Sequence, residues 1–203
     1  MNKPHNIEQF FKSDCQFVIG AYKAEHIKES RLPEIAFIGR SNVGKSSLIN
    51  SLVNCKIAIT SKTPGRTRQL NFFELGKRLS IVDMPGYGYA KVGKKQVANW
   101  EKLSYQYFAS RINLKRVFVL IDARRNIGEK DKEIINIFDS LAVSYQLVLT
   151  KTDQLKPQQL EAVIQKLENE SKKFPALHPT ILATSSINKK GVLELRKAIV
   201  EIM

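Results

Sequence analysis

Residues 34–46 read EIAFIGRSNVGKS, and this stretch decides the fold of the chain. Its first part, Glu34 to Gly39, is a short apolar run that ends in glycine, which predicts a buried strand. The run KSSLINSLV, from Lys45 to Val53, has the spacing of a helix. A strand, then G-x-x-x-x-G-K-S, then a helix is the context in which this pattern binds phosphate. We expect phosphate contacts from the residues of the pattern: Gly39, Arg40, Ser41, Asn42, Val43, Gly44, Lys45 and Ser46.

Each part of this phosphate loop, residues 39–46, has a chemical reason. Glycine lets successive backbone N–H groups turn toward phosphates, and the following helix contributes the positive end of its dipole. The ammonium group of Lys45 suits the β- and γ-phosphates of a nucleotide, and the hydroxyl of Ser46 suits Mg²⁺. We therefore predict a catalytic role for Lys45 and a place in the metal shell for Ser46.

Outward from this segment, the chain alternates between strand and helix patterns. Further strands are predicted at 69–75, 78–82, 115–121, 145–149 and 179–182, and helices at 97–108, 134–141, 160–167 and 192–203. Such alternation implies the three-layer α/β class, a mostly parallel sheet with helices on both faces. Gly76-Lys77 is a hairpin signal, so we expect one antiparallel edge strand. Residues 1–33 are predicted to be an N-terminal extension packed on a main domain of residues 34–203.

A second glycine loop follows the predicted strand at 78–82. Ligands bind at the carboxyl ends of parallel strands, so an aspartate leaving this strand lies where a nucleotide with Mg²⁺ needs it. Asp83 is suited to hold the metal through its water shell, and Gly86 lets a backbone N–H approach the γ-phosphate. The nucleotide contacts expected here are Asp83, Met84, Pro85 and Gly86.

The polar loop between these two motifs contains a threonine that is expected to complete the metal shell when the γ-phosphate is present. Thr67 is our choice, because the next strand begins just after it, with Thr63 and Thr60 as alternatives. Thr67 joins Lys45 and Gly86 in the predicted catalytic group. Nucleotide contacts are expected from Gly65, Arg66, Thr67, Arg68 and Gln69.

Two later loops indicate which nucleotide base the protein binds. The strand at 145–149 runs into Thr150, Lys151, Thr152 and Asp153. A carboxylate offers two acceptors to the adjacent N1–H and N2–H₂ donors of guanine, for which adenine has no equivalent, so Asp153 predicts guanine specificity. The stem of Lys151 is able to lie over the base plane. Near the guanine O6 we expect Thr184, Ser185 and Ser186, although serines also suit a simple turn.

The chain is strongly basic. Its 203 residues include 33 Lys and Arg against 19 Asp and Glu, a formal net charge of +14. This excess favours nucleic acid, a ribonucleoprotein or an anionic membrane surface as partner, although a solvated lysine-rich surface gives the same balance. A hydrophobic share of 43% and a charged share of 26% exclude a disordered or fibrous protein.

Other residue types exclude several classes of site. Cys15 and Cys55 are too few for a disulfide scaffold, and the three histidines are too far apart in the sequence for a zinc pattern. No apolar run approaches the ~20 residues of a membrane span, and the N-terminus lacks the apolar segment of a signal peptide. We therefore expect a cytoplasmic protein without a membrane span. A monomer is also expected.

Taken in order, GRSNVGKS, TPGRTRQLNFF, DMPGYGYA, TKTD and TSS resemble the motifs of a translation-factor-class GTPase domain. More narrowly, TPGRTRQLNFF and GYGYA resemble the EngB (YihA/YsxC) family of bacterial ribosome-biogenesis GTPases, over essentially the whole chain. The resemblance implies a Ras-like P-loop GTPase fold and hydrolysis of GTP to GDP and phosphate with Mg²⁺. It also implies a role in assembling the large ribosomal subunit or its precursor, through rRNA, and a link to cell division and septum formation. The last loop reads TSS where Ser-Ala is more usual, which leaves its base contacts open.

Two positions bear on hydrolysis. Ras-like GTPases place a water-orienting glutamine directly after D-x-x-G. Tyr87 stands there in this chain and lacks the amide, so slow intrinsic hydrolysis is predicted, with help from an ion or a partner. Asn42 resembles the asparagine that holds K⁺ in some related GTPases, although asparagine is equally suited to an unusual turn conformation.

Three functions are weighed. The first is a GTP-driven assembly factor on ribosomal RNA, which the basic residues favour. The second is a signalling-type GTPase that acts through protein partners in cell division. Such a protein should show a lipidation motif or an amphipathic basic anchor, and KAIVEIM at the C-terminus ends without a cysteine. The third, the GTPase of a tRNA-modifying enzyme, needs an extra catalytic domain. The basic clusters are Lys62/Arg66/Arg68, Lys91/Lys94/Lys95, Arg124/Arg125, Lys172/Lys173 and Lys189/Lys190.

Overall fold

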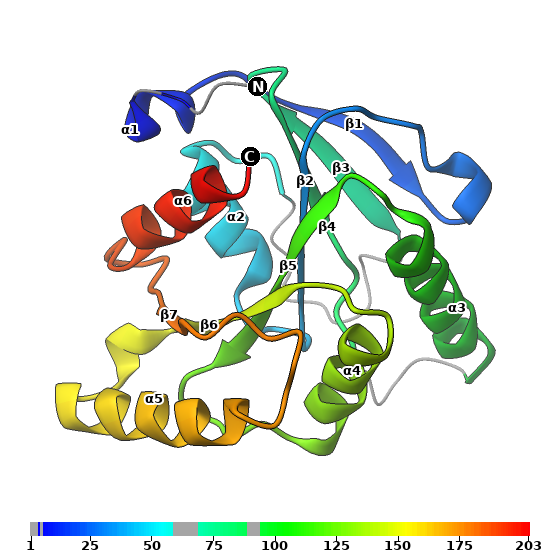
Figure 1. The fold of residues 1–203 in the computed structure, drawn as a ribbon. Coiled ribbons are helices and arrows are strands. Elements are labelled where there is room, and N and C mark those ends of the chain that lie inside the picture. Colours follow the sequence, from blue (N-terminus) through cyan, green and yellow to red (C-terminus); the bar gives the residue numbers. More distant parts are fainter. Residues whose placement is uncertain (1–3, 5, 59–68, 89–93) are drawn as a thin grey trace.

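Figure 1 shows the computed structural model of the chain, which describes residues 4, 6–58, 69–88 and 94–203. The strands are β1 (Cys15–Ala21), β2 (Glu34–Gly39), β3 (Leu70–Leu75), β4 (Leu79–Asp83), β5 (Leu114–Asp122), β6 (Tyr145–Thr150) and β7 (Leu182–Ala183). The α-helices are α1 (Ile7–Phe10), α2 (Lys45–Val53), α3 (Lys94–Ser110), α4 (Glu129–Ser140), α5 (Pro157–Ser171) and α6 (Val192–Glu201). Across these described ranges, no helix is both long and apolar enough to span a membrane.

The strands form one sheet in the order β1-β3-β4-β2-β5-β6-β7. β2 is parallel to β4 and β5, and β6 is parallel to β5 and β7. β3 is antiparallel to both of its neighbours, β1 and β4. The predicted three-layer α/β class with a mostly parallel sheet is confirmed. The antiparallel strand lies one position in from the edge, rather than at it, because β1 pairs outside it.

The predicted N-terminal extension supplies this outermost strand. β1 aligns Cys15 with Leu75 and Ala21 with Leu70, with a bulge between. At the end of α1, Phe10 and Phe11 are buried in the core, and α1 lies against α6. Strands from both sides of residue 33 therefore belong to the same sheet. A domain boundary at that residue stays a prediction.

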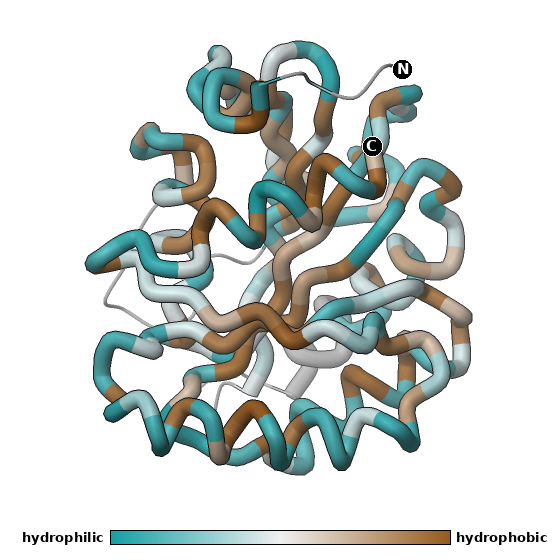
Figure 2. Tube along the Cα trace, turned by 60° about the vertical axis from the view of Figure 1, so that its left-hand side comes forward, coloured by the Kyte–Doolittle hydropathy of each residue, from teal (hydrophilic) through white to brown (hydrophobic). Residues whose placement is uncertain are grey.

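Helices cover both faces of the sheet (Figure 1). α2 and α6 pack on one face through residues such as Leu48 and Leu195. α3, α4 and α5 pack on the other face, where Tyr107 and Phe138 belong to the core. The side chains of β2 alternate between the two faces, so the whole run EIAFIG is buried. Figure 2 shows the apolar residues gathered in the strands and the polar residues on the outer turns of the helices.

The last strand is shorter than predicted. The sequence predicts a strand at 179–182, but β7 pairs with β6 only at Leu182 and Ala183. Side chains engage the backbone of Thr180 instead. Its N–H donates to Nδ1 of His178 at 3.2 Å, and its C=O accepts from Nε2 of Gln146 at 2.8 Å. These bonds occupy the groups that a longer strand presents to its neighbour.

A buried carboxylate fixes the end of β2 opposite the phosphate loop. Glu34 is fully buried and accepts hydrogen bonds from Ser80, Tyr107 and Arg111 at 2.8–2.9 Å. A buried charge is stable when it is paired and hydrogen-bonded, and Glu34 meets both conditions. This cluster joins β2 to β4 and to the end of α3, which makes β2 a rigid base for the loop that follows it.

Candidate functional site

The phosphate loop connects the end of β2 to the start of α2. Asn42 has φ 61° and Gly44 has φ 101°, so both adopt the left-handed conformation that lets the backbone curl back. Gly39 passes close to β5, because a Cβ at this position lies 2.9 Å from the carbonyl oxygen of Leu120. α2 begins without a capping side chain, which leaves its first backbone N–H groups available to an anion.

Lys45 and Asp83 bring the first two predicted motifs together. Lys45 begins α2, Asp83 ends the neighbouring strand β4, and the two buried side chains form an ion pair. Among the described residues, the second carboxylate oxygen of Asp83 and the hydroxyl of half-buried Ser46 have no hydrogen-bond partner. These free oxygens fit Mg²⁺, which prefers oxygen ligands.

The second glycine loop is bound to the phosphate loop through its backbone. The N–H of Tyr87 donates to the C=O of Gly39, and the N–H of Ser41 donates to the C=O of Tyr87, both at 3.2 Å. A Cβ on Gly86 lies 3.2 Å from the nitrogen of Ser41 and 3.3 Å from the oxygen of Gly39. Glycine is therefore the residue that lets the two loops approach this closely.

The side chain of Tyr87 is buried and hydrogen-bonds to α4. Its hydroxyl donates to Oδ1 of Asp131 at 2.7 Å, and Oδ2 of the same carboxylate accepts from the N–H of Gly128 at 2.8 Å. Burial, followed by the charge of Asp131, raises the pKa of Tyr87, so the hydroxyl stays protonated and donates. A phenol held in this way has no amide to orient a water molecule.

The two loops predicted to contact the base lie together at the ends of β6 and β7. The hydroxyl of Ser185 donates to Oδ1 of Asp153 at 2.5 Å, which fixes one oxygen of an otherwise exposed carboxylate. The N–H of Thr152 donates to the C=O of Thr184 at 3.2 Å, which joins the loops through their backbones. Ser186 follows at the surface of this turn and is half-buried.

β6 also ends against the phosphate loop. The hydroxyl of Thr150 donates to the C=O of Val43, and Nζ of Lys151 donates to the C=O of Asn42, both at 2.7 Å. Nζ of Lys151 also donates to Oδ2 of Asp122 at 3.0 Å. The predicted base loops and the phosphate loop therefore form one connected edge of the sheet.

Asp122 is a site residue that the sequence interpretation missed. It ends β5, accepts from Nε of Arg124 at 2.8 Å and from Nη2 at 2.7 Å, and holds Lys151. The hydrogen bonds from Arg124, followed by those from Lys151, lower the pKa of Asp122. The available signal was its position, since an aspartate directly after an apolar strand is the feature that identified Asp83.

Some residues predicted to contact the nucleotide are buried in the core or pair with other residues, and some lie outside the described ranges. Met84 and Pro85 are buried, and the side chain of Met84 belongs to the core. Nε2 of Gln69 donates to Oδ1 of Asn71 at 2.8 Å, and Gln69 lies against Gly20 of β1. Outside the described residues are Thr60, Lys62, Thr63, Gly65, Arg66, Thr67, Arg68 and Lys91.

Curated relatives resemble the chain over nearly its full length. Residues 34–151 match the family described as 50S ribosome-binding GTPase. The chain is 46% identical over 194 residues to the probable GTP-binding protein EngB of Caulobacter vibrioides, which covers 95% of this chain and 85% of that protein. It is 48% identical to the protein of the same description from Bradyrhizobium diazoefficiens, with coverages of 96% and 91%.

Solved structures share the fold. A probable GTP-binding protein engB superposes with a TM-score of 0.67 over 83% of this chain and 97% of that one, at 24% identity. Era in complex with MgGDPNP and nucleotides 1506–1542 of 16S ribosomal RNA gives a TM-score of 0.67 at 25% identity, over 86% of this chain and 57% of that one. Both solved structures thus share the fold of this chain.

Proposed function

Because the chain belongs to the EngB family of GTP-binding proteins, we propose that it acts as a nucleotide-dependent assembly factor for the large ribosomal subunit. Membership of this family makes the chain a GTPase. The ribosomal partner is supported by the family description, 50S ribosome-binding GTPase, and by the net charge of +14. We also propose the role in cell division and septum formation that the sequence resemblance implies, and a cytoplasmic location.

The residues at the ends of β2 and β4 are suited to bind the phosphates. Backbone N–H groups of the phosphate loop surround them, and Lys45 exchanges its partner Asp83 for the β- and γ-phosphates. Of the described residues, Ser46 would hold Mg²⁺ through its hydroxyl and Asp83 would hold it through its water shell; the ion would neutralise phosphate charge. Thr67, which lies outside the described residues, is proposed to join them when the γ-phosphate is present.

The observation that carries guanine recognition is the hydrogen bond between Ser185 and Asp153. It holds the carboxylate in one orientation, so that both acceptors face the N1–H and N2–H₂ groups of one base. Lys151, tied to Asn42 and Asp122, keeps its stem beside the phosphate loop, where the base plane is expected.

Hydrolysis is proposed to need an ion or a partner, since the hydroxyl of Tyr87 is bound to Asp131. Asn42 is exposed, and in the described part of the chain its side-chain amide has no hydrogen-bond partner. Its amide oxygen is therefore free for K⁺. This proposal is tested by measuring the GTPase rate in potassium and in sodium, with faster hydrolysis expected in potassium. Equal rates exclude a role for K⁺ at Asn42 and indicate that a protein or an RNA activates hydrolysis.

The decisive experiment for the function is co-sedimentation with ribosomal subunits across a salt series, with a GTP analogue, with GDP and without nucleotide. We expect the large subunit to retain the protein best with the GTP analogue, and retention to fall steeply with salt. A flat salt response, or the same affinity in all nucleotide states, contradicts this function. Weak association that ignores nucleotide favours instead the signalling-type GTPase that acts through protein partners.

A further inference from the structure

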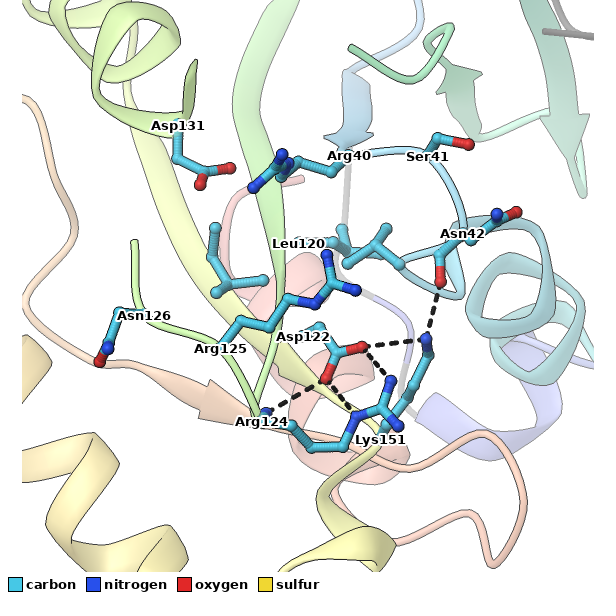
Figure 3. Close-up of a pocket in the computed structure, with 12 residues that line it drawn as sticks. Arg40, Ser41, Asn42, Leu120, Asp122, Arg124, Arg125, Asn126, Asp131 and Lys151 are labelled. Atoms are coloured by element: carbon cyan, nitrogen blue, oxygen red, sulfur yellow. Dashed lines mark hydrogen bonds and ion pairs between the residues drawn. The ribbon is translucent and has the colours of Figure 1, made fainter. Parts of the chain in front are cut away.

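A cavity of about 340 Å³ lies between the phosphate loop, the end of β5 and α4 (Figure 3). Residues 40–43 of the phosphate loop form one wall, and residues 120–122 and 124–126 form another. Asp131 of α4 and Lys151 complete the lining. The cavity is open to solvent at Arg125, whose side chain is exposed.

The cavity shares a wall with the nucleotide site but is not that site. Lys45 and Ser46, proposed to hold the phosphates and the metal ion, do not line it, and neither does Asp153, proposed to hold the base. Residues 40–43 and Lys151, which are expected to contact the nucleotide, line it as well. The cavity therefore lies next to the proposed phosphate and base positions and extends away from them toward Arg125 and Asp131.

Positive charge dominates the lining. Four cationic side chains face two carboxylates: Arg40, Arg124, Arg125 and Lys151 against Asp122 and Asp131. Arg124 and Lys151 are both hydrogen-bonded to Asp122, whose single negative charge offsets half of their combined charge. Figure 3 shows these contacts as dashed lines from Asp122.

The remaining two cations have no such partner. Asp131 lines the same cavity, but its two oxygens accept from the hydroxyl of Tyr87 and the N–H of Gly128. Within the described part of the chain, no hydrogen bond or ion pair reaches the guanidinium of Arg40 or of Arg125. Figure 3 shows both side chains at the cavity without a dashed line. Two unpaired guanidinium groups at one cavity make a site for an anion.

We propose that this cavity binds a phosphate group of RNA through Arg40 and Arg125. A guanidinium presents its N–H donors in a planar fork that matches the oxygens of a phosphate. RNA is favoured over an acidic peptide because the net charge of +14 attracts a polyanion over long range, and each phosphate contact releases counterions. The identity of the RNA as ribosomal rests on the proposed function, whereas the chemistry of the site does not.

Arg40 connects this cavity to the second glycine loop. A Cβ on Gly88 lies 3.4 Å from Nε of Arg40, and a Cβ on Gly128 lies 3.5 Å from its Nη1. The backbone of Arg40 also bridges to Tyr87. A phosphate held by Arg40 therefore acts on the residues next to Gly86, so RNA and guanine nucleotide change each other's affinity by the same factor.

The test compares Arg125→Gln with Lys173→Gln, which removes the same charge from an exposed residue after α5. The probes are a fluorescein-labelled oligouridine, followed by anisotropy, and purified large subunits, followed by co-sedimentation. For the oligouridine, Arg125→Gln is expected to lower the slope of log affinity against log salt by about 0.7, the loss of one single-strand phosphate contact. The affinity of Arg125→Gln for the oligouridine is expected to fall roughly tenfold, as for the loss of one hydrogen bond to a charged group. Lys173→Gln leaves both values near wild type, and GDP affinity is unchanged in both variants.

The outcomes separate this site from the proposed function. Equal slopes in Arg125→Gln and Lys173→Gln overturn the phosphate site, even if wild type binds large subunits. Loss of subunit binding in Arg125→Gln with no effect on oligouridine overturns the RNA assignment and indicates an acidic protein segment. An Arg125-dependent oligouridine affinity, in a protein that ignores large subunits, supports the phosphate site and overturns the ribosomal function.

Discussion

Replacing Tyr87 with Phe removes one hydroxyl and leaves the ring in place. Its partner, Asp131, is 1% exposed and Tyr87 is 4% exposed, so water does not replace the lost donor at Oδ1. A hydrogen bond to a charged group contributes about 1.5–3 kcal/mol, and the loss leaves a buried acceptor without a partner. For a domain of this size, each kcal/mol lowers Tm by roughly 2–4 °C, so we expect Tyr87→Phe to lower it by about 3–12 °C.

The assay is thermal unfolding followed by circular dichroism, with Tyr145→Phe as the matched control. Tyr145 is also buried, but its hydroxyl lies 3.3 and 3.5 Å from the oxygens of half-buried Asp139, a longer and weaker contact. We expect a loss below about 1 kcal/mol in this control. Equal losses in the two variants refute the reasoning. We expect the basal GTPase rate of Tyr87→Phe to equal that of wild type. A large fall in this rate means that the hydroxyl of Tyr87 takes part in hydrolysis.

Three further predictions concern the nucleotide and acid stability. Asp153→Asn shifts nucleotide preference from GTP toward XTP in competition titration. Ser185→Ala weakens GTP binding without changing the preferred base. If the wild-type protein binds ATP as well as GTP, the assignment of guanine recognition to Asp153 is wrong. Lys45→Ala abolishes tight GTP binding in calorimetry while the far-ultraviolet spectrum is kept, and retained affinity excludes the phosphate role of Lys45. The pKa of Asp122 is lower in the folded than in the unfolded chain, so its stabilisation is present above about pH 4 and is lost as the pH falls below that value. In urea unfolding, Asp122→Asn is therefore expected to reduce the fall in the free energy of unfolding below about pH 4. The same pH dependence in wild type and variant shows that the ion pairs of Asp122 with Arg124 and Lys151 do not cause the loss of stability in acid.

The parts of the fold that follow from local pattern were predictable. β2 and α2 have the expected extents because the apolar run, the glycines and the helical spacing all lie within a few residues of one another. The predicted motifs after β4 and β6 contact the phosphate loop, and the motif after β7 joins the one after β6, because strand ends in a parallel sheet share one edge. Asp153 and Ser185, far apart in the sequence, are brought together in this way.

The parts that depend on long-range pairing were not predictable. The carboxylate that holds Tyr87 comes from Asp131, on a helix whose docking no local pattern specifies. Asp122 follows a strand as Asp83 does, but no glycine beside it marked a phosphate contact. β7 is short because Gln146, from the neighbouring strand, engages the carbonyl of Thr180, and a propensity argument sees only the residues of one segment.

The outer position of β1 has a consequence for synthesis. Cys15 and Ala21 leave the ribosome early, but their partners Leu75 and Leu70 are made only after the whole of α2. Until then the N-terminal segment has no strand to pair with, and Phe17, which is 54% exposed even in the finished fold, is fully open to other chains. Closing the sheet at β1 is thus a late, non-local event, which favours slow completion of folding and exposes the nascent chain to aggregation.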